Sequence, residues 1–184
     1  MSIMSVKKNG NGDEYYTPDY VVEILVPYLK NKNIKKIWCP CDKETSEYVR
    51  VFKNNGFDVI YSHIDNGQDF LNYIPDEDYD CIITNPPFSI KNKILERCIE
   101  LNKPFAILLS ATVIQSASLV QILSKLEDFK MIMFDKRISY SGDRPPFPSW
   151  YFTNMLLDKN EFYIYKEDPK YLYNIWKEKI EKER

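Results

Sequence analysis

The chain has 184 residues, of which 44% are hydrophobic and 28% charged, as expected for one globular domain with a substantial core. Its 25 Lys and Arg residues stand against 27 Asp and Glu, so the formal net charge is -2. This balance excludes a strongly basic surface, and any contact with nucleic acid must come from a local patch. No apolar run is as long as a membrane helix and no signal peptide is recognisable, so we expect a cytoplasmic protein without membrane contact.

The four cysteines indicate reduced thiols rather than disulfides or a metal site. Cys39 and Cys41 are separated by one proline, which is not the spacing of a zinc knuckle. Cys81 and Cys98 fall in a predicted strand and a predicted helix. His63 is the single histidine, so a mixed site of Cys and His is not expected. We therefore predict no bound metal.

The N-terminal part of the chain is expected to be a flexible arm followed by a capped helix. Residues 1–13 are polar and lack periodicity, so they are predicted to precede a single domain over 14–184. Thr17 is expected to cap a helix that starts at Pro18 and runs to Leu29. Pro27 predicts a kink or an early end in this helix.

From residue 34 onward, short apolar strands alternate with amphipathic helices. Strands are expected at 34–38, 57–65, 80–84, 105–109 and 130–134, and helices at 90–101, at 113–126 and before Gly56. This alternation predicts an α/β fold with a mostly parallel, doubly wound sheet and helices on both faces.

The C-terminal part of the chain departs from the alternation. Residues 137–149 form a long irregular loop, and two strands at 150–157 and 161–165 follow. Because only residues 158–160 join these strands, we expect a C-terminal antiparallel hairpin. A charged amphipathic helix over 169–184 is expected to pack through Tyr171, Leu172, Ile175 and Trp176.

The most informative segment is Asn85-Pro86-Pro87-Phe88, directly after the apolar strand that ends at Thr84. Two prolines stop the strand and stiffen the turn, so an amide and an aromatic ring are placed at the carboxyl end of a strand, where open α/β sheets bind ligands. The segment resembles the catalytic motif of S-adenosylmethionine-dependent amino-methyltransferases, above all the phage-type DNA N6-adenine methyltransferase family. The alternative is that the segment has no catalytic role and is only a strand terminated by proline and followed by a surface Phe.

The resemblance implies a Rossmann-like class I methyltransferase fold with S-adenosyl-L-methionine as cofactor. It also implies roles for two segments near the methionine part of that cofactor. Tyr16, Thr17 and Pro18 resemble the motif that precedes the core in one class of adenine methyltransferases. The turn after the first strand is usually rich in glycine, but here it contains none. Its residues Cys39, Pro40 and Asp42 resemble a Pro/Asp version of this turn found in phage-associated enzymes.

Asp42 has two possible roles in this turn. The resemblance implies that its carboxylate accepts a hydrogen bond from the cofactor's ammonium group. The alternative is an acid at a helix N-terminus, where negative charge interacts favourably with the helix dipole.

The residues after the second strand are expected to hold the nucleoside part of the cofactor. His63 or Asp65 could bond the ribose hydroxyls, although a lone histidine can also be purely structural. Asp69 and Phe70 resemble the pair that contacts the adenine of the cofactor. Alternatively, Asp69 only caps a short helical turn and does not contact the cofactor.

The long loop over 137–149 resembles the target-base loop of phage adenine methyltransferases. Arg137, Tyr140 and Phe147 are suited to stack on a base and to hold a phosphate, which makes them the expected substrate-binding residues. A proline-rich surface loop is the alternative. The chain carries no inserted target-recognition domain, so a long recognition sequence is not expected.

Three hypotheses about function follow from these residues. The first is methyl transfer to N6 of adenine in DNA, by an enzyme encoded by a phage or prophage. The second keeps the chemistry but changes the substrate to RNA adenine or a protein glutamine. The third is a catalytically degenerate binding or inhibitor protein of the same fold, suggested by the turn without glycine and by His63.

Overall fold

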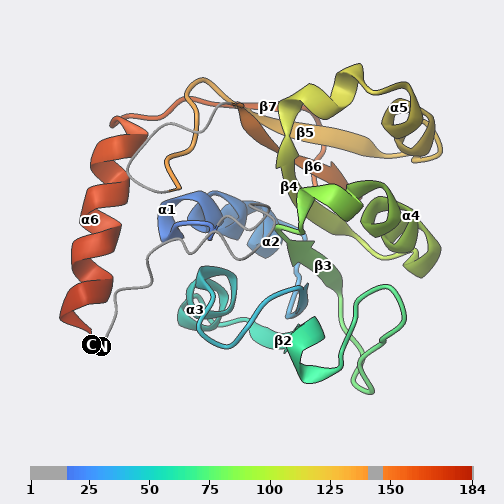
Figure 1. Cartoon of the computed structure of the whole chain (residues 1–184), viewed down its shortest axis with the longest axis horizontal. Helices are drawn as coiled ribbons and strands as arrows, with labels where there is room; N and C mark the ends of the chain where they lie inside the picture. Colours follow the sequence, from blue (N-terminus) through green and yellow to red (C-terminus); the bar gives the residue numbers. More distant parts are fainter. Residues whose placement is uncertain (1–15, 141–146, 184) are drawn as a thin grey trace.

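The computed structural model of the chain describes residues 16–140 and 147–183, in which seven strands form one sheet (Figure 1). The strands are β1 (Lys36–Pro40), β2 (Asp58–Ser62), β3 (Cys81–Thr84), β4 (Phe105–Ser110), β5 (Phe129–Phe134), β6 (Ser149–Asn154) and β7 (Glu161–Tyr163). The α-helices are α1 (Asp19–Val22), α2 (Val26–Asn31), α3 (Glu47–Asn54), α4 (Lys91–Leu101), α5 (Ala117–Leu123) and α6 (Pro169–Lys182). Short 3-10 helices are η1 (Glu23–Leu25), η2 (Ile64–Asn66), η3 (Phe88–Ile90) and η4 (Ala111–Gln115). The predicted arm over 1–13 lies outside the described residues.

The strand order is β2-β1-β3-β4-β6-β5-β7. Within the described residues, β6 runs antiparallel to both its neighbours, and the remaining pairs of neighbouring strands are parallel. The expected mostly parallel, doubly wound α/β sheet is therefore confirmed. The chain winds outward from β1 to β2 and then returns to place β3 on the other side of β1. Ligands in such sheets bind beyond the carboxyl ends of the strands at this reversal.

The expected C-terminal hairpin is wrong in its pairing. The antiparallel strand is present, but β6 does not pair with β7. All six residues of β6 pair with β4, and four of them also pair with β5, so both edges of β6 are occupied. The edge that remains open is the outer edge of β5, and β7 pairs there in parallel register from Ile132 with Glu161 to Phe134 with Tyr163.

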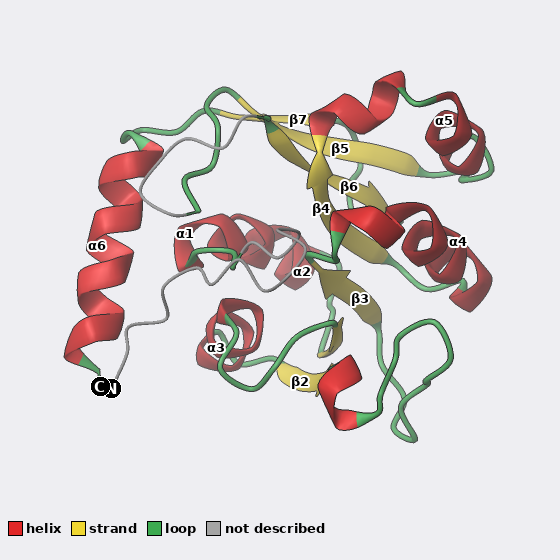
Figure 2. Ribbon diagram, viewed as in Figure 1, coloured by secondary structure: helices red, strands yellow, loops and turns green. Residues whose placement is uncertain are grey.

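Helices cover both faces of the sheet, as the continuous burial of β3 and of most of β1 and β4 requires (Figures 1 and 2). On one face, Ile37, Cys39 and Ile83 pack with α1 and α3. On the other face, Trp38 and Ile82 pack with α4 and α5. Successive side chains of a strand point to opposite faces, so each strand contributes to both cores.

Two local expectations about the helices need correction, and the interruption expected at Pro27 is present. Thr17 does not cap α1: Pro18 occupies the N-cap position without a side-chain cap, and Thr17 bonds elsewhere. Pro27 stands in the first turn of α2, after the 3-10 turn η1, because proline lacks the amide proton that a continuous helix would use. The single helix expected over 113–126 is the shorter pair η4 and α5.

The C-terminal helix α6 packs against α1 and partly buries Leu172 and Trp176. Tyr171 and Ile175, which were expected to pack as well, are 55% and 47% exposed. No helix in the described part of the chain is long and apolar enough to cross a bilayer.

Candidate active site

The candidate site lies at the carboxyl ends of β1 and β3, the two strands at the reversal of the sheet. Thr84, the last residue of β3, is fully buried, and its hydroxyl donates to the carbonyl of Pro40, the last residue of β1. The same oxygen lies 3.3 Å from Oδ2 of Asp42. Thr84 therefore fixes the start of the motif at residues 85–88 against the turn that follows β1.

The turn after β1 reaches its shape without glycine. Cys41 has a φ of 65°, the left-handed conformation that glycine adopts most readily. The amide of Asp42 donates to the carbonyl of Ser62 at 3.1 Å, which ties the turn to the end of β2. The absence of glycine therefore does not prevent a left-handed bend here.

Asp42 is a buried acid at this turn. Its side chain is 8% exposed, and burial raises its pKa to about 7, while hydrogen bonds from Ser46 and Thr84 act in the opposite direction. An isolated buried carboxylate is costly, so a cationic group nearby would favour its ionised form. The arrangement suits the ammonium group that the resemblance places here, but that role stays a prediction.

Asn85 is joined to the segment before α1. Its Nδ2 donates to Oγ1 of Thr17 at 3.1 Å, across 68 residues of sequence. Thr17 and Pro18 are buried, whereas Tyr16 is 46% exposed. The structure therefore brings together two predicted segments, the motif at 85–88 and the residues at 16–18.

The aromatic end of the motif meets the far end of the predicted substrate loop. Pro86 is buried, while Pro87 and Phe88 are half-buried. The rings of Phe88 and Phe147 are 5.3 Å apart in an edge-to-face arrangement. The carbonyl of Pro148 accepts from the amide of Ala111 at 2.8 Å, which anchors the end of the loop beside β4.

The other end of this loop is held differently. Arg137 is exposed, but Tyr140 is only 2% exposed and belongs to the core cluster beside α1 and α3. Its ring therefore packs against protein in this structure. The amide of Ser139 donates to the hydroxyl of Tyr20 at 3.1 Å, so α1 supports the start of the loop. Residues 141–146 lie outside the described residues.

The predicted ribose residues follow β2 and form a small polar cluster. Nδ1 of His63 accepts from the amide of Asp65 at 3.1 Å and so caps η2. The Asp65 carboxylate pairs with Lys43 at 2.6 Å, and the hydrogen bond from Lys43 lowers the pKa of Asp65. His63 thus has a structural role, and a ribose role for either residue stays a prediction.

Asp69 and Phe70 also have clear structural roles. The Asp69 carboxylate accepts from the amide of Leu71 at 3.1 Å and from Nδ2 of Asn72 at 3.3 Å, so it closes its own turn. Phe70 is 2% exposed, and its ring lies 5.1 Å from that of Trp38. The turn lies in the long loop between η2 and β3 (Figure 2). Their cofactor role stays a prediction.

Sequence reasoning missed one residue that builds the site, Thr84, and the pairing of two buried tyrosines, Tyr48 and Tyr151. Thr84 appears in the sequence only as the polar end of an apolar strand. The hydroxyls of Tyr48 and Tyr151 lie 3.1 Å apart, and both side chains are buried. Their aromatic character predicts burial, but no local signal indicates that their hydroxyls meet.

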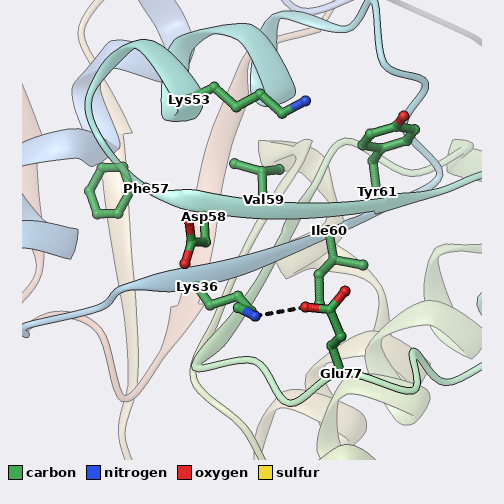
Figure 3. A pocket seen from close by; sticks show the side chains of 8 residues that line it. All are labelled: Lys36, Lys53, Phe57, Asp58, Val59, Ile60, Tyr61 and Glu77. Carbon is green, nitrogen blue, oxygen red and sulfur yellow. Dashed lines mark hydrogen bonds and ion pairs between the residues drawn. The ribbon is translucent and has the colours of Figure 1, made fainter.

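A surface hollow of about 530 Å³ lies away from this site, along the edge strand β2 (Figure 3). Val59 and Tyr61 lie on the same side of the strand as Lys53, whereas Ile60 lies on the side of Glu77, which pairs with Lys36 at 2.8 Å. Lys36 and Asp58 begin their strands, so the hollow reaches the amino ends. Ligands of open α/β sheets bind at the opposite ends, and we do not assign the cofactor to it.

Comparison with known proteins identifies the fold. No family model and no curated protein matches the sequence. Among solved structures, the chain is similar to a candidate class I S-adenosylmethionine-dependent methyltransferase of Listeria monocytogenes, with a TM-score of 0.54, 11% identity, and coverage of 87% of this chain and 69% of that chain. A candidate RNA methyltransferase of Pyrococcus horikoshii gives a TM-score of 0.48 and 13% identity, over 79% of this chain and 87% of that chain. The first likeness shows that this chain has the class I methyltransferase fold.

Proposed function

We propose that the chain is an S-adenosylmethionine-dependent methyltransferase that acts on N6 of adenine in DNA. The observation that carries the proposal is the position of Asn85. Its amide stands at the carboxyl end of a central strand, at the reversal of a class I methyltransferase sheet, and is bonded to Thr17. The residue types also fit the cofactor, since the buried Asp42 carboxyl is a suitable acceptor for an ammonium group.

The chemistry requires acceptors for the hydrogens of a poor nucleophile. The lone pair of an exocyclic amino nitrogen is conjugated into the base. In the proposed mechanism, Asn85 Oδ1 and the Pro86 carbonyl each accept one N6 hydrogen, which directs the lone pair out of the base plane. S-adenosylmethionine, when bound, supplies an electrophilic methyl group. The bond from N6 to this methyl group would form as the methyl–sulfur bond breaks, which would leave S-adenosylhomocysteine, and one N6 proton would leave to water.

The aromatic residues complete the proposed site. In this proposal Phe88 and Phe147, whose ring centroids are 5.3 Å apart, contact the face of the base. Asn85 Oδ1 is shielded from solvent in this structure, so an incoming amino group has to displace the atoms that cover it. A base in a duplex must also leave the stack to reach such a site. Because the net charge is -2, a nucleic-acid substrate would be bound by a local patch of the surface rather than by a strongly basic face.

The test combines calorimetric titration with S-adenosylmethionine and methyl transfer to DNA, RNA and glutamine-containing peptides. We expect binding of the cofactor, formation of N6-methyladenine in DNA, and loss of transfer by about a hundredfold or more in Asn85→Ala without loss of cofactor affinity. Asn54→Ala, at an exposed position at the end of α3, is the matched control and should retain full activity.

Other outcomes of this test separate the hypotheses. Transfer to RNA or glutamine alone would keep the enzyme and replace its substrate. Unchanged turnover in Asn85→Ala would refute the mechanism. No detectable binding of the cofactor would overturn the proposal and favour a binding or inhibitor protein.

A further inference from the structure

The edge strand β7 carries the two most exposed large apolar side chains of the described residues. β7 is the last strand at its end of the sheet (Figure 1). Phe162 is 74% exposed and Ile164 is 66% exposed. Tyr163, between them, packs on the opposite face, where its ring centroid lies 6.1 Å from that of Phe134. Single exposed apolar side chains are ordinary, but two on one face of an edge strand indicate a contact surface.

The neighbouring strand β5 extends this apolar surface. Met133 of β5 is in register with Phe162, so the two side chains point to the same face of the sheet. Met133 is half-buried and belongs to neither of the two core clusters, whereas its neighbours Ile132 and Phe134 are buried on the other face. We call Met133, Phe162 and Ile164 the β7 surface.

The backbone of β7 is unpaired along its outer side. In a parallel pair, alternate residues of a strand direct both backbone groups to the same neighbour. The Tyr163 carbonyl accepts from the amide of Asp135 at 3.2 Å, and the amide of Tyr165 donates to Oδ1 of Asp135 at 3.0 Å. Tyr163 and Tyr165 therefore face β5, and the N–H and C=O groups of Phe162 and Ile164 point away from it. No other described residue bonds these four outward groups.

The opposite edge of the sheet, at β2, is better protected. Val59, Ile60 and Tyr61 of that strand are half-buried, and Nζ of Lys53 lies 5.4 Å from the ring centroid of Tyr61. Charges and prolines at an edge discourage pairing with another strand. β7 has one charged residue, Glu161 at its start, and no proline. β7 is therefore the edge that fits a further strand.

A second copy of the chain supplies a strand that matches this edge. When two β7 strands run antiparallel about a two-fold axis at Tyr163, Phe162 of each copy faces Ile164 of the other. These two residues carry the outward backbone groups, so each facing pair exchanges two hydrogen bonds and all the outward groups are satisfied. Facing side chains of an antiparallel pair lie on the same face, so apolar meets apolar across the axis.

The charges beside β7 agree with the same register. Continued beyond the strand, it places Lys159 opposite Glu167, Asn160 opposite Lys166 and Glu161 opposite Tyr165 of the second copy. No like charges face each other, whereas like charges directly opposite would be destabilising. An axis at Phe162 would instead place Ile164 opposite the polar Asn160, which lies outside β7.

We propose that β7 is a homodimerisation edge, at which the β7 strands of two copies pair antiparallel about an axis at Tyr163 and join the two sheets. A helix would cover the apolar side chains, but a strand also satisfies the four outward groups. The paired stretch is short, so the contact belongs with weak interfaces and depends on protein concentration. Across the axis the strands reverse direction, so the candidate sites lie toward opposite ends of the joined sheet. The proposal does not depend on the proposed function.

The test is sedimentation velocity of the whole chain between about 5 μM and about 500 μM, a range that covers weak association. We expect the wild type to pass from monomer to dimer with rising concentration. Phe162→Lys and Ile164→Glu, both at exposed positions, should stay monomeric. Ile74→Lys, at a position that is 52% exposed in the loop before β3, is the control and should associate like the wild type.

A mixture of the two variants tests the register. In the proposed pairing, Phe162→Lys of one copy faces Ile164→Glu of the other, and the second facing pair stays apolar. The equimolar mixture should therefore form more dimer than either variant alone at the same total concentration. An axis at Phe162 gives no such facing pair of opposite charges.

Amide hydrogen exchange of the wild type locates the contact without any substitution. The amides of Phe162 and Ile164 should exchange about tenfold more slowly at the highest concentration than at the lowest, because pairing protects them. The amide of Tyr163 already faces β5 and should change little.

Two results would overturn the proposal. A wild type that stays monomeric over the whole range would leave the β7 surface to a partner of another kind. A dimer that persists in Phe162→Lys and Ile164→Glu, with unchanged exchange at Phe162 and Ile164, would have its interface elsewhere. Circular dichroism identifies any variant that does not fold, and the exchange of the wild-type amides then decides the result.

Discussion

Asn85 and Asp69 belong to motifs that resemble the same enzyme family, yet their side chains are used differently. Asn85 bonds to Thr17, 68 residues away in sequence. Asp69 bonds to Leu71 and Asn72, within its own turn. The first is held by distant elements at the reversal of the sheet, and the second stabilises a local loop. A short motif in the sequence does not distinguish these two cases.

The aromatic residues of the same two motifs, Phe88 and Phe70, also differ in their surroundings. Phe88 is half-buried and meets the ring of Phe147 at the candidate site. Phe70 is 2% exposed and packs edge-to-face against Trp38 in the core. The two regions are therefore expected to respond differently to substitution: one in stability, the other in activity.

The largest expected effect separates the two phenylalanines. Phe70→Ala should lower the free energy of unfolding by about 3–5 kcal/mol, because it leaves a cavity against Trp38. Phe88→Ala should cost clearly less stability and act mainly on substrate binding. Urea denaturation of both variants measures the difference. Equal losses of stability would show that Phe88 is as much a core residue as Phe70.

A second prediction concerns the buried acid of the site. Burial raises the pKa of Asp42 to about 7, above its unfolded value, so the folded protein binds a proton that the unfolded chain releases. Stability should therefore fall as the pH rises from about 4 to about 7, by at most about 4 kcal/mol from this group. Asp42→Asn should lack this loss.

The measurement is urea denaturation of both proteins at about pH 5 and about pH 8. The advantage of Asp42→Asn over the wild type should grow with pH. An advantage that does not change with pH would mean that the Asp42 carboxyl does not titrate in this window. The proposed cofactor role predicts an opposite effect on binding. Because the ammonium group should bind the ionised Asp42 carboxylate, the affinity for S-adenosylmethionine should increase between about pH 5 and about pH 8.

The smallest expected effect sharpens the contrast at Asp69. Asp69→Ala should lower the free energy of unfolding by about 1 kcal/mol, since it removes two local hydrogen bonds at a partly buried turn. Calorimetric titration of the folded variant with S-adenosylmethionine tests the predicted contact between Asp69 and the cofactor. A tenfold or larger loss of S-adenosylmethionine affinity would give Asp69 the cofactor contact that its motif predicts.

The strands were predictable because each one carries its own signal. Apolar runs such as Phe105–Leu109 indicate burial on both faces, and their alternation with helices indicates parallel pairing. The position of Asn85 was also predictable, since two prolines must end a strand. The pairing of β7 was not, because its register with β5 depends on β6 having filled the neighbouring position.

By itself, the sequence determined the fold class and placed Asn85-Pro86-Pro87-Phe88 at a strand end. Periodicity and proline act locally, so these features can be deduced from neighbouring residues. Only the tertiary structure decided that Thr17 bonds Asn85 and that Tyr48 meets Tyr151, 103 residues away. Hydrophobic patterning specifies that a side chain is buried, but its hydrogen-bond partner depends on which elements meet there once the sheet has formed.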